Sequence, residues 1–165
     1  MYNDCILPSE QAKLSIQRIA YQIHEDNSHE KSIVIAGVMS NGNQLAKSIA
    51  SVLRTISDID VIDCQIQIDK KNPRNKIKTS INANVYENQS IVIVDDVLHT
   101  GSTLIYAVSH FLKVPLTQCK VAVLINRNHK KFPLKADYKG ISLSTSMQEH
   151  VEIVCKNDTF EGFLT

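Results

Sequence analysis

The chain has 165 residues, of which 43% are hydrophobic, and a formal net charge of +1 at neutral pH. This length suits one domain with a substantial core, so we expect residues 1–165 to form a single domain. The net charge is close to zero, so it does not indicate a protein that binds membrane surfaces or nucleic acid. No apolar run is long enough to span a bilayer.

The amino-terminal part predicts a helix, a buried strand and a second helix. No signal-peptide pattern opens the chain and its four cysteines form no C-x-x-C pair, so we expect a cytoplasmic protein with reduced thiols. An apolar stripe predicts a helix over residues 9–26, a buried strand follows at residues 32–37, and a second helix at residues 44–56. The loop Gly37 to Asn43, between strand and helix, is a weak candidate for anion binding.

A long polar stretch follows the next predicted strand. Apolar and polar residues alternate over residues 60–68, which predicts a strand with one exposed face. Residues 69–84 show no periodicity and include five basic residues, Lys70, Lys71, Arg74, Lys76 and Lys78. Two interpretations stay open: a lid that closes over a site, or a solvated basic hairpin.

The strongest functional signal lies between Ser90 and Leu104. Four β-branched residues, Ile91 to Val94, predict a strand buried on both faces, and Asp95 and Asp96 follow it. A short turn then leads into a predicted helix that begins at Leu104. This order is typical of a ligand site at the carboxyl edge of an α/β sheet.

The turn from Thr100 to Thr103 indicates a phosphate ligand. Its backbone N–H groups would lie unpaired at a helix N-terminus, and three of its four residues add hydroxyl donors. Asp95 and Asp96 could instead accept hydrogen bonds from sugar hydroxyls or hold the water shell of Mg²⁺. A sugar phosphate with a free cis-diol satisfies both demands. The alternative, that the two acids only cap the turn, ranks well behind.

The carboxyl-terminal part adds further strands. Residues 120–126 predict another buried strand, and a basic loop follows at residues 127–131. Two short strands are expected near residues 151–155 and 159–163. Alternating strands and helices, followed by short terminal strands, predict an α/β fold: a doubly wound, mainly parallel sheet flanked by helices, with a small β appendage.

Residues 92–103, Val-Ile-Val-Asp-Asp-Val-Leu-His-Thr-Gly-Ser-Thr, resemble the phosphoribosyl-pyrophosphate (PRPP) motif of the type I phosphoribosyltransferases. In particular the chain resembles the bifunctional pyrimidine-operon attenuators with uracil phosphoribosyltransferase activity, over nearly its whole length. The resemblance implies the type I phosphoribosyltransferase fold, with the appendage as a hood. It implies a glycosyltransferase that moves phosphoribose to uracil, another pyrimidine or a 6-oxopurine and releases pyrophosphate. The alternative is an RNA-binding, nucleotide-sensing regulator of pyrimidine gene expression with little or no catalysis.

The resemblance also implies roles for individual residues. Asp95 and Asp96 would hold the ribose hydroxyls of PRPP and, through water, its Mg²⁺. His99 would be catalytic and face the base, and residues 70–84 would form the lid. The remaining implied sets are the 5′-phosphate turn, Thr100, Gly101, Ser102 and Thr103; the pyrophosphate loop, Met39, Ser40, Asn41 and Gly42; and the base-binding residues Val97, Leu98, Arg127, Tyr138 and Lys139, with the Tyr138 ring available for stacking.

The chain departs from the attenuators' pattern at charged positions. Its loop Met39 to Gly42 has no cation where they usually carry an arginine, and Ser102 also stands where arginine is usual. The loss of a guanidinium removes bidentate contact with pyrophosphate.

By resemblance we expect Mg²⁺ as cofactor, PRPP and a nucleobase or nucleotide as partners, RNA as an alternative partner, and a homodimer or higher homo-oligomer without membrane contact.

Overall fold

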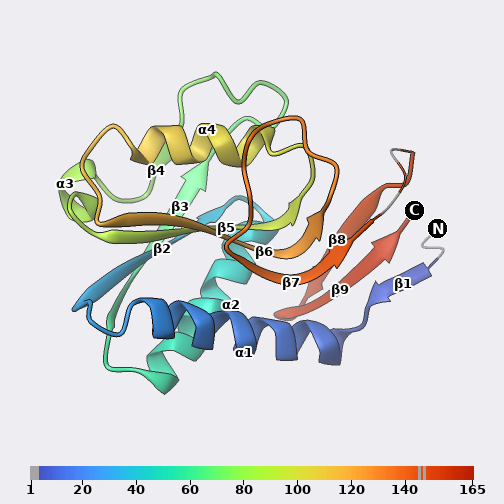
Figure 1. Ribbon diagram of the computed structural model, residues 1–165, viewed down its shortest axis with the longest axis horizontal. Coiled ribbons are helices and arrows are strands. Elements are labelled where there is room, and N and C mark those ends of the chain that lie inside the picture. The colour runs from blue at the N-terminus through green and yellow to red at the C-terminus, as the bar shows by residue number, and fades with distance from the viewer. Residues whose placement is uncertain (1–3, 145, 147) are drawn as a thin grey trace.

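The structure is a computed structural model that describes residues 4–144, 146 and 148–165. Helices and strands alternate through most of this range (Figure 1). In chain order the elements are β1 (Asp4–Leu7), α1 (Ser9–Asp26), β2 (Ser32–Val38), α2 (Asn41–Ile56), β3 (Asp60–Gln67), β4 (Lys78–Thr79), α3 (Ala83–Tyr86), β5 (Ser90–Leu98), α4 (Ser102–Phe111), β6 (Gln118–Arg127), β7 (Tyr138–Leu143), β8 (Val151–Lys156) and β9 (Thr159–Leu164). Within the described residues, no helix combines the length and the apolar character that crossing a bilayer requires.

The larger of two sheets has the strand order β4-β3-β2-β5-β6-β7. β2 pairs in parallel with β3 and β5, and the parallel ladder continues from β5 to β6 and β7. β4 lies antiparallel at the edge beside β3. The runs of β-branched residues in β2, β5 and β6 suit strands that are buried on both faces. The predicted α/β fold with a mainly parallel sheet is therefore confirmed.

Helices cover both faces of this sheet (Figure 1). α1 and α2 lie on one face and α4 on the other. Because successive side chains of a strand point to opposite faces, β5 contributes to both cores. Val92 and Val94 pack with α1 and α2, whereas Ile91 and Ile93 pack with α4. The apolar run of β5 is thus held between two helical layers.

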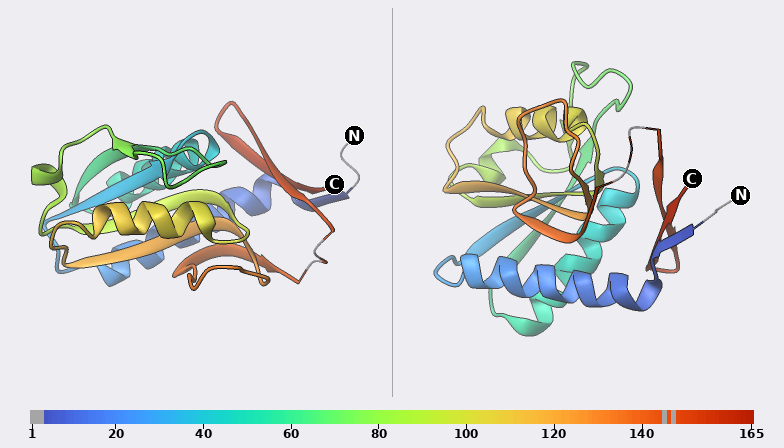
Figure 2. Two further views of the ribbon diagram at one scale, coloured as in Figure 1. Left: turned by 90° about the horizontal axis from the view of Figure 1, so that it is seen from above. Right: turned by 45° about the vertical axis from the view of Figure 1, so that its right-hand side comes forward.

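The smaller sheet is antiparallel, with the order β1-β9-β8. Figure 2 shows it as a separate layer at the end of the molecule where the chain terminates. It is the predicted appendage, enlarged by β1, which the sequence did not indicate. Asn41 at the start of α2 donates a hydrogen bond from Nδ2 to the carbonyl of Ile153 in β8, at 2.9 Å. This contact fixes the smaller sheet against the carboxyl end of the larger one.

Three boundaries differ from the prediction at the sheet edge that matters for function. α2 begins at Asn41, so that residue and Gly42 belong to its first turn. β5 runs on through the two acids to Leu98, where it still pairs with Asn126 of β6. α4 begins at Ser102. Backbone pairing with β6 continues the strand beyond its apolar run, which the composition of residues 95–98 did not indicate.

Asn27, directly after α1, ties this helix to the amino ends of β5 and β6. Its side chain is fully buried, donates from Nδ2 to Ile23 O at 2.8 Å, and accepts at Oδ1 from Ser90 Oγ at 2.6 Å and Gln118 Nε2 at 2.8 Å. We expect Asn27→Ala to lower the free energy of unfolding by about 2 kcal/mol, since buried donors lose their acceptor. Urea denaturation measures this. Ser28→Ala, at the exposed neighbour, is the control, and an equally small change in both variants would contradict the prediction.

Candidate active site

The residues of the PRPP-like motif lie where the strand order of the larger sheet reverses. The chain passes from β2 outward to β3, and then returns to β5 on the other side of β2. The connections after β2 and β5 therefore diverge, one to α2 on the first face and the other to α4 on the second (Figure 1). Such a reversal leaves a crevice at the carboxyl ends of the strands.

A pocket of about 450 Å³ occupies this crevice. It brings together the end of β5, the turn into α4, the start of α2, the end of β6, the loop after β3 and the smaller sheet. The lining residues are Asn41, Lys70, Asp95, Asp96, Val97, Leu98, His99, Thr100, Gly101, Ser102, Thr103, Leu104, Arg127, His150, Val151, Glu152 and Ile153. The two acids, the turn, His99 and Arg127 thus share one pocket.

Asp95 and Asp96 lie side by side in different surroundings. Asp95 is 3% exposed, and its Oδ1 lies 3.4 Å from Lys70 Nζ. Burial, and next the charge of Asp96, raise the pKa of Asp95 to about 7, while the ammonium of Lys70 opposes them. Asp96 is less buried and accepts at Oδ2 from Asn41 Nδ2 at 3.0 Å. A cation or hydroxyl donors beside Asp95 would favour its ionised form.

The turn between β5 and α4 lines the pocket and leads into the first turn of α4. Gly101 has a φ of +85°, in the left-handed region that glycine adopts without strain. Ser102 N–H donates to Thr100 Oγ1 at 3.2 Å, and the carbonyl of Thr100 accepts from the N–H groups of Lys131 and Phe132 at 2.9 and 3.0 Å. The first N–H groups of a helix have no helical acceptor, and the dipole adds positive charge. The N–H groups of Lys131 and Phe132 therefore hold the turn, and the turn lines the pocket at a helix N-terminus, a position that favours an anion.

Gly42, in the first turn of α2, packs directly against β5. A Cβ at this position would lie 2.8 Å from the carbonyl oxygen of Val94 and 2.9 Å from Asp95 Oδ1. Only glycine allows this approach without a shift of the backbone. Asn41, one residue earlier, lines the pocket. Two of the four predicted pyrophosphate-loop residues therefore border the carboxylate pair.

The other two predicted loop residues lie further out. Met39 lines an adjoining hollow of about 310 Å³, together with Lys76 and Lys78 of the polar stretch after β3. Its N–H donates to Ile66 O at 3.1 Å, which holds the loop against the end of β3. Ser40 is exposed, and in the part of the chain that the structure describes it lines neither the pocket nor this hollow.

His99 and Arg127 border the side of the pocket toward β6. Arg127 ends β6, is 3% exposed, and donates from Nη2 to Ser146 O at 2.9 Å. Burial, followed by the positive charges of Arg127 and His150, lowers the pKa of His99 below its usual value. The lowered pKa favours the neutral imidazole of His99, which has one donor and one acceptor nitrogen.

The structure places Tyr138 and Lys139 away from this pocket, which corrects their predicted position beside the base. Tyr138 opens β7 and pairs with Ala122 in the amino-terminal half of β6, and its hydroxyl donates to Asp26 Oδ2 at 2.5 Å. The carbonyl of Lys139 accepts from Arg18 at 2.9 Å. Because β7 runs parallel to β6, its first residues lie toward the sheet edge opposite the carboxyl end of β5. A stacking role for the Tyr138 ring is not supported.

Two parts of the pocket were missing from the predicted site. Residues 150–153 reach it because the smaller sheet lies across the end of β5, and Asn41 holds that sheet in place. Such a contact between distant segments leaves no local pattern in the sequence. Lys70 was predicted only as part of a lid, yet it contacts Asp95 directly.

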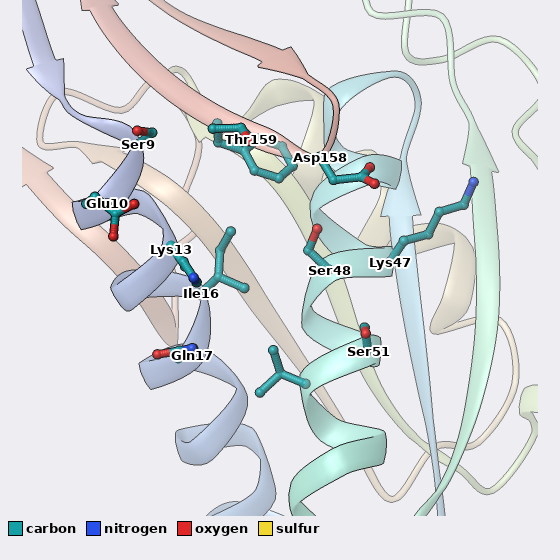
Figure 3. A pocket seen from close by; sticks show the side chains of 12 residues that line it. Ser9, Glu10, Lys13, Ile16, Gln17, Lys47, Ser48, Ser51, Asp158 and Thr159 are labelled. Carbon is teal, nitrogen blue, oxygen red and sulfur yellow. The ribbon is translucent and has the colours of Figure 1, made fainter.

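A second, larger hollow of about 580 Å³ lies between α1, α2 and the turn from β8 to β9 (Figure 3). Figure 3 shows Lys13 and Ile16 of α1 on one wall and Ser48 and Ser51 of α2 on the other, with Asp158 above. Among the residues that the structure describes, its lining shares none with the pocket of the PRPP-like motif. The larger hollow is therefore separate from the candidate site.

Similar proteins are found by sequence and by structure. Residues 3–157 match the phosphoribosyl transferase domain. The chain is 33% identical over 147 residues to the Bifunctional protein PyrR of Streptococcus thermophilus, covering 86% of this chain and 84% of that protein. It is 34% identical over 159 residues to the Bifunctional protein PyrR of Fusobacterium nucleatum, covering 92% and 90%.

Among solved structures, the chain resembles a hypoxanthine-guanine phosphoribosyltransferase from Bacillus anthracis, with a TM-score of 0.76, 19% identity and 99% of each chain covered. The hypoxanthine phosphoribosyltransferase of Trypanosoma cruzi gives a TM-score of 0.80 at 15% identity, covering 98% of this chain and 97% of that one. At these identities the two structures bear on the fold alone.

Proposed function

Because the chain belongs to the phosphoribosyl transferase family, we propose that it transfers phosphoribose from PRPP to a nucleobase and releases pyrophosphate. The resemblance to type I phosphoribosyltransferases that the sequence indicated is confirmed at the level of the family. The observation that carries the proposal for this chain is the convergence of the acid pair Asp95–Asp96 with the turn Thr100–Thr103 in one pocket.

The proposed binding mode follows from the chemistry of the lining. The 5′-phosphate accepts hydrogen bonds from the N–H and hydroxyl groups of the turn Thr100–Thr103. The ribose hydroxyls donate to Asp95 and Asp96, whose oxygens are acceptors when ionised. The base then lies toward β6, between Val97, Leu98, His99 and Arg127, all of which line the pocket.

Mg²⁺ is the proposed cofactor because it binds diphosphate groups. Hard carboxylate oxygens suit Mg²⁺, which usually keeps several waters and binds substrate phosphates. In the described part of the chain, no three His, Cys, Asp or Glu side chains converge into a metal site. Asp95 and Asp96 therefore fit a role as partners of the ion's water shell. When bound, the ion would supply positive charge to the leaving diphosphate.

The reaction is a displacement at the anomeric carbon of the ribose. A ring nitrogen of the base forms the new bond as the carbon–oxygen bond to pyrophosphate breaks, and positive charge develops on the ribose. The proton of that ring nitrogen passes to solvent or to the released pyrophosphate. The carboxylates of Asp95 and Asp96 stabilise that charge. His99, as a neutral imidazole, can accept or donate a hydrogen bond at the base. His150 and the first residues of β8 line the pocket on the side of the smaller sheet.

Pyrophosphate release tests the proposed activity. The protein is mixed with PRPP and MgCl₂ and, in separate reactions, with uracil, hypoxanthine, guanine or xanthine. We expect release that depends on Mg²⁺ and on one of these bases. PRPP with Mg²⁺ should also raise the melting temperature, because a ligand that binds only the folded state stabilises it. Silence with all four bases, together with an unchanged melting temperature, would exclude the proposal.

The second candidate function is an RNA-binding regulator that senses nucleotides through the same pocket. The observation that favours it is the exposed basic stretch Lys70 to Lys78 beside the pocket. Contacts with RNA phosphates make affinity fall steeply with salt. Titration of RNA at two salt concentrations separates the candidates: a steep salt dependence supports regulation, and undetectable or salt-independent binding counts against it.

A further inference from the structure

We propose that Lys70 is the cation that binds the diphosphate of PRPP, an assignment that rests on the proposed function. A diphosphate requires charged or N–H donors around it. The loop Met39–Gly42 contains no lysine or arginine. Among the described residues that line the pocket, two side chains carry a permanent positive charge, Lys70 and Arg127. The question is which of these two faces the leaving group.

The strand order places the two cations on opposite sides of the ribose position. Lys70 follows β3, which lies beyond β2 on one side of β5, whereas Arg127 ends β6 on the other side. In a displacement, the incoming base and the outgoing diphosphate occupy opposite faces of the same carbon. The start of α2, at Asn41, offers N–H groups and a helix dipole that favour an anion. The diphosphate therefore belongs on the side of α2 and Lys70.

The contacts of Lys70 support this placement. Its Nζ lies 3.4 Å from Asp95 Oδ1, and a Cβ at Gly42 would lie 2.9 Å from the same oxygen. The ammonium and the first turn of α2 thus meet at one carboxylate oxygen. The Lys70 side chain is 46% exposed, against 4% for Asp95. Lys70 can therefore turn its ammonium from the carboxylate to a ligand phosphate, while Asp95 stays fixed for the ribose.

The surroundings of Lys70 add positive charge on the same side. Lys76 and Lys78 line the hollow that also contains Met39 and Asp69, the residue directly before Lys70. Figure 1 shows the segment between β3 and β4, in green, as a loop that stands clear of the sheet. Clustered charges of one sign raise the local concentration of an anionic ligand. Lys70 is the member of this basic segment that enters the pocket itself.

Binding of two related ligands by Lys70→Met tests the assignment. PRPP and ribose 5-phosphate share the 5′-phosphate and the ribose hydroxyls, but the diphosphate is present only in PRPP. We expect Lys70→Met to weaken PRPP binding roughly 10- to 100-fold, as removal of a charge-assisted contact does, and ribose 5-phosphate binding less than about threefold. Lys70→Arg should recover most of the PRPP affinity. Isothermal titration with Mg²⁺ present measures the affinities of the unaltered protein and of both variants for the two ligands.

Lys113→Met is the matched control, because it removes one exposed lysine charge beyond the far end of α4. It should leave both affinities unchanged. Equal weakening of PRPP and ribose 5-phosphate in Lys70→Met would show that Lys70 acts only through Asp95, and would overturn the assignment. Unchanged PRPP binding would overturn it as well. If the unaltered protein binds neither compound, the proposed function itself fails, and the assignment falls with it.

Discussion

Asp95→Asn is expected to lower PRPP-dependent turnover roughly 100-fold while it stabilises the folded protein above neutral pH. Turnover falls because the carboxylate that accepts from the ribose, and that faces the developing positive charge, becomes a neutral amide. Stability rises because the wild-type carboxylate is 3% exposed and lies beside Asp96, so that its ionisation in the folded state is costly. Function and stability therefore change in opposite directions at this position.

The pH dependence of the stability change has a definite sign. The folded state raises the pKa of Asp95 to about 7, whereas an unfolded aspartate titrates near about 3.9. Between these values the folded state binds more protons than the unfolded state, so the free energy of unfolding falls as the pH rises from about 4 to about 7. Asparagine does not titrate. The advantage of Asp95→Asn should thus be on the order of 2 to 4 kcal/mol at pH 8 and should almost vanish near pH 4.

Melting temperatures of both proteins between pH 4 and pH 8, together with pyrophosphate release, check this prediction. Asp58→Asn serves as control, because Asp58 is exposed in the turn between α2 and β3. Asp58→Asn should leave pyrophosphate release unchanged and should change the free energy of unfolding by less than about 0.5 kcal/mol. A melting temperature of Asp95→Asn that is equal to or below that of the wild type at pH 8 would contradict the argument.

Gly42→Ala is expected to weaken PRPP binding more than about tenfold and to lower the free energy of unfolding by about 1 to 3 kcal/mol. The new Cβ would lie 2.8 Å from the carbonyl oxygen of Val94 and 2.9 Å from Asp95 Oδ1. The Val94 carbonyl belongs to the central strand β5 and cannot move aside. The start of α2 must therefore shift, and Asn41 then loses its 3.0 Å hydrogen bond to Asp96.

Helix propensity alone predicts the opposite effect of Gly42→Ala on stability. Alanine is favoured over glycine inside a helix by about 1 kcal/mol, so a substitution without steric conflict would stabilise α2. Ser51→Ala, on the exposed face of the same helix, is the control and should be neutral or slightly stabilising. Chemical denaturation and PRPP titration give the two measurements. Stabilisation by Gly42→Ala with normal PRPP affinity would contradict the close approach of α2 to β5.

The parts of the fold that could be predicted from the sequence have short-range physical causes. The helix over residues 9–26 has the bounds of α1, since a 3.6-residue apolar stripe records which face is buried. The β-branched run Ile91 to Val94 similarly reports a strand buried on both faces. The acids and the glycine-containing turn that follow were predicted to lie together in one site for the same reason: their chemistry lies within one local segment, and the structure places them in one pocket.

The remaining parts of the site depend on contacts between distant segments. Residues 150–153 reach the pocket only because the smaller sheet lies across β5. Lys70 contacts Asp95 only because the sheet order β3-β2-β5 brings the end of β3 close to the end of β5. Tyr138 shows the reverse case. Its position was inferred from resemblance alone, and the direction of β7 carries it to the opposite edge, where Asp26 binds its hydroxyl.

The pairing of β1 with β9 has a consequence for how the protein is made. Asp4 and Cys5 are paired with Leu164 and Phe163, so β1 cannot form its pairs until β9, about 160 residues later in the chain, has been synthesised. Contacts that join such distant residues carry the largest loop-closure cost and slow folding. All strands of the larger sheet, and the turn Thr100–Thr103, have been synthesised once the chain reaches Leu143. A nascent chain can therefore hold half of its pocket before the wall supplied by β8 exists.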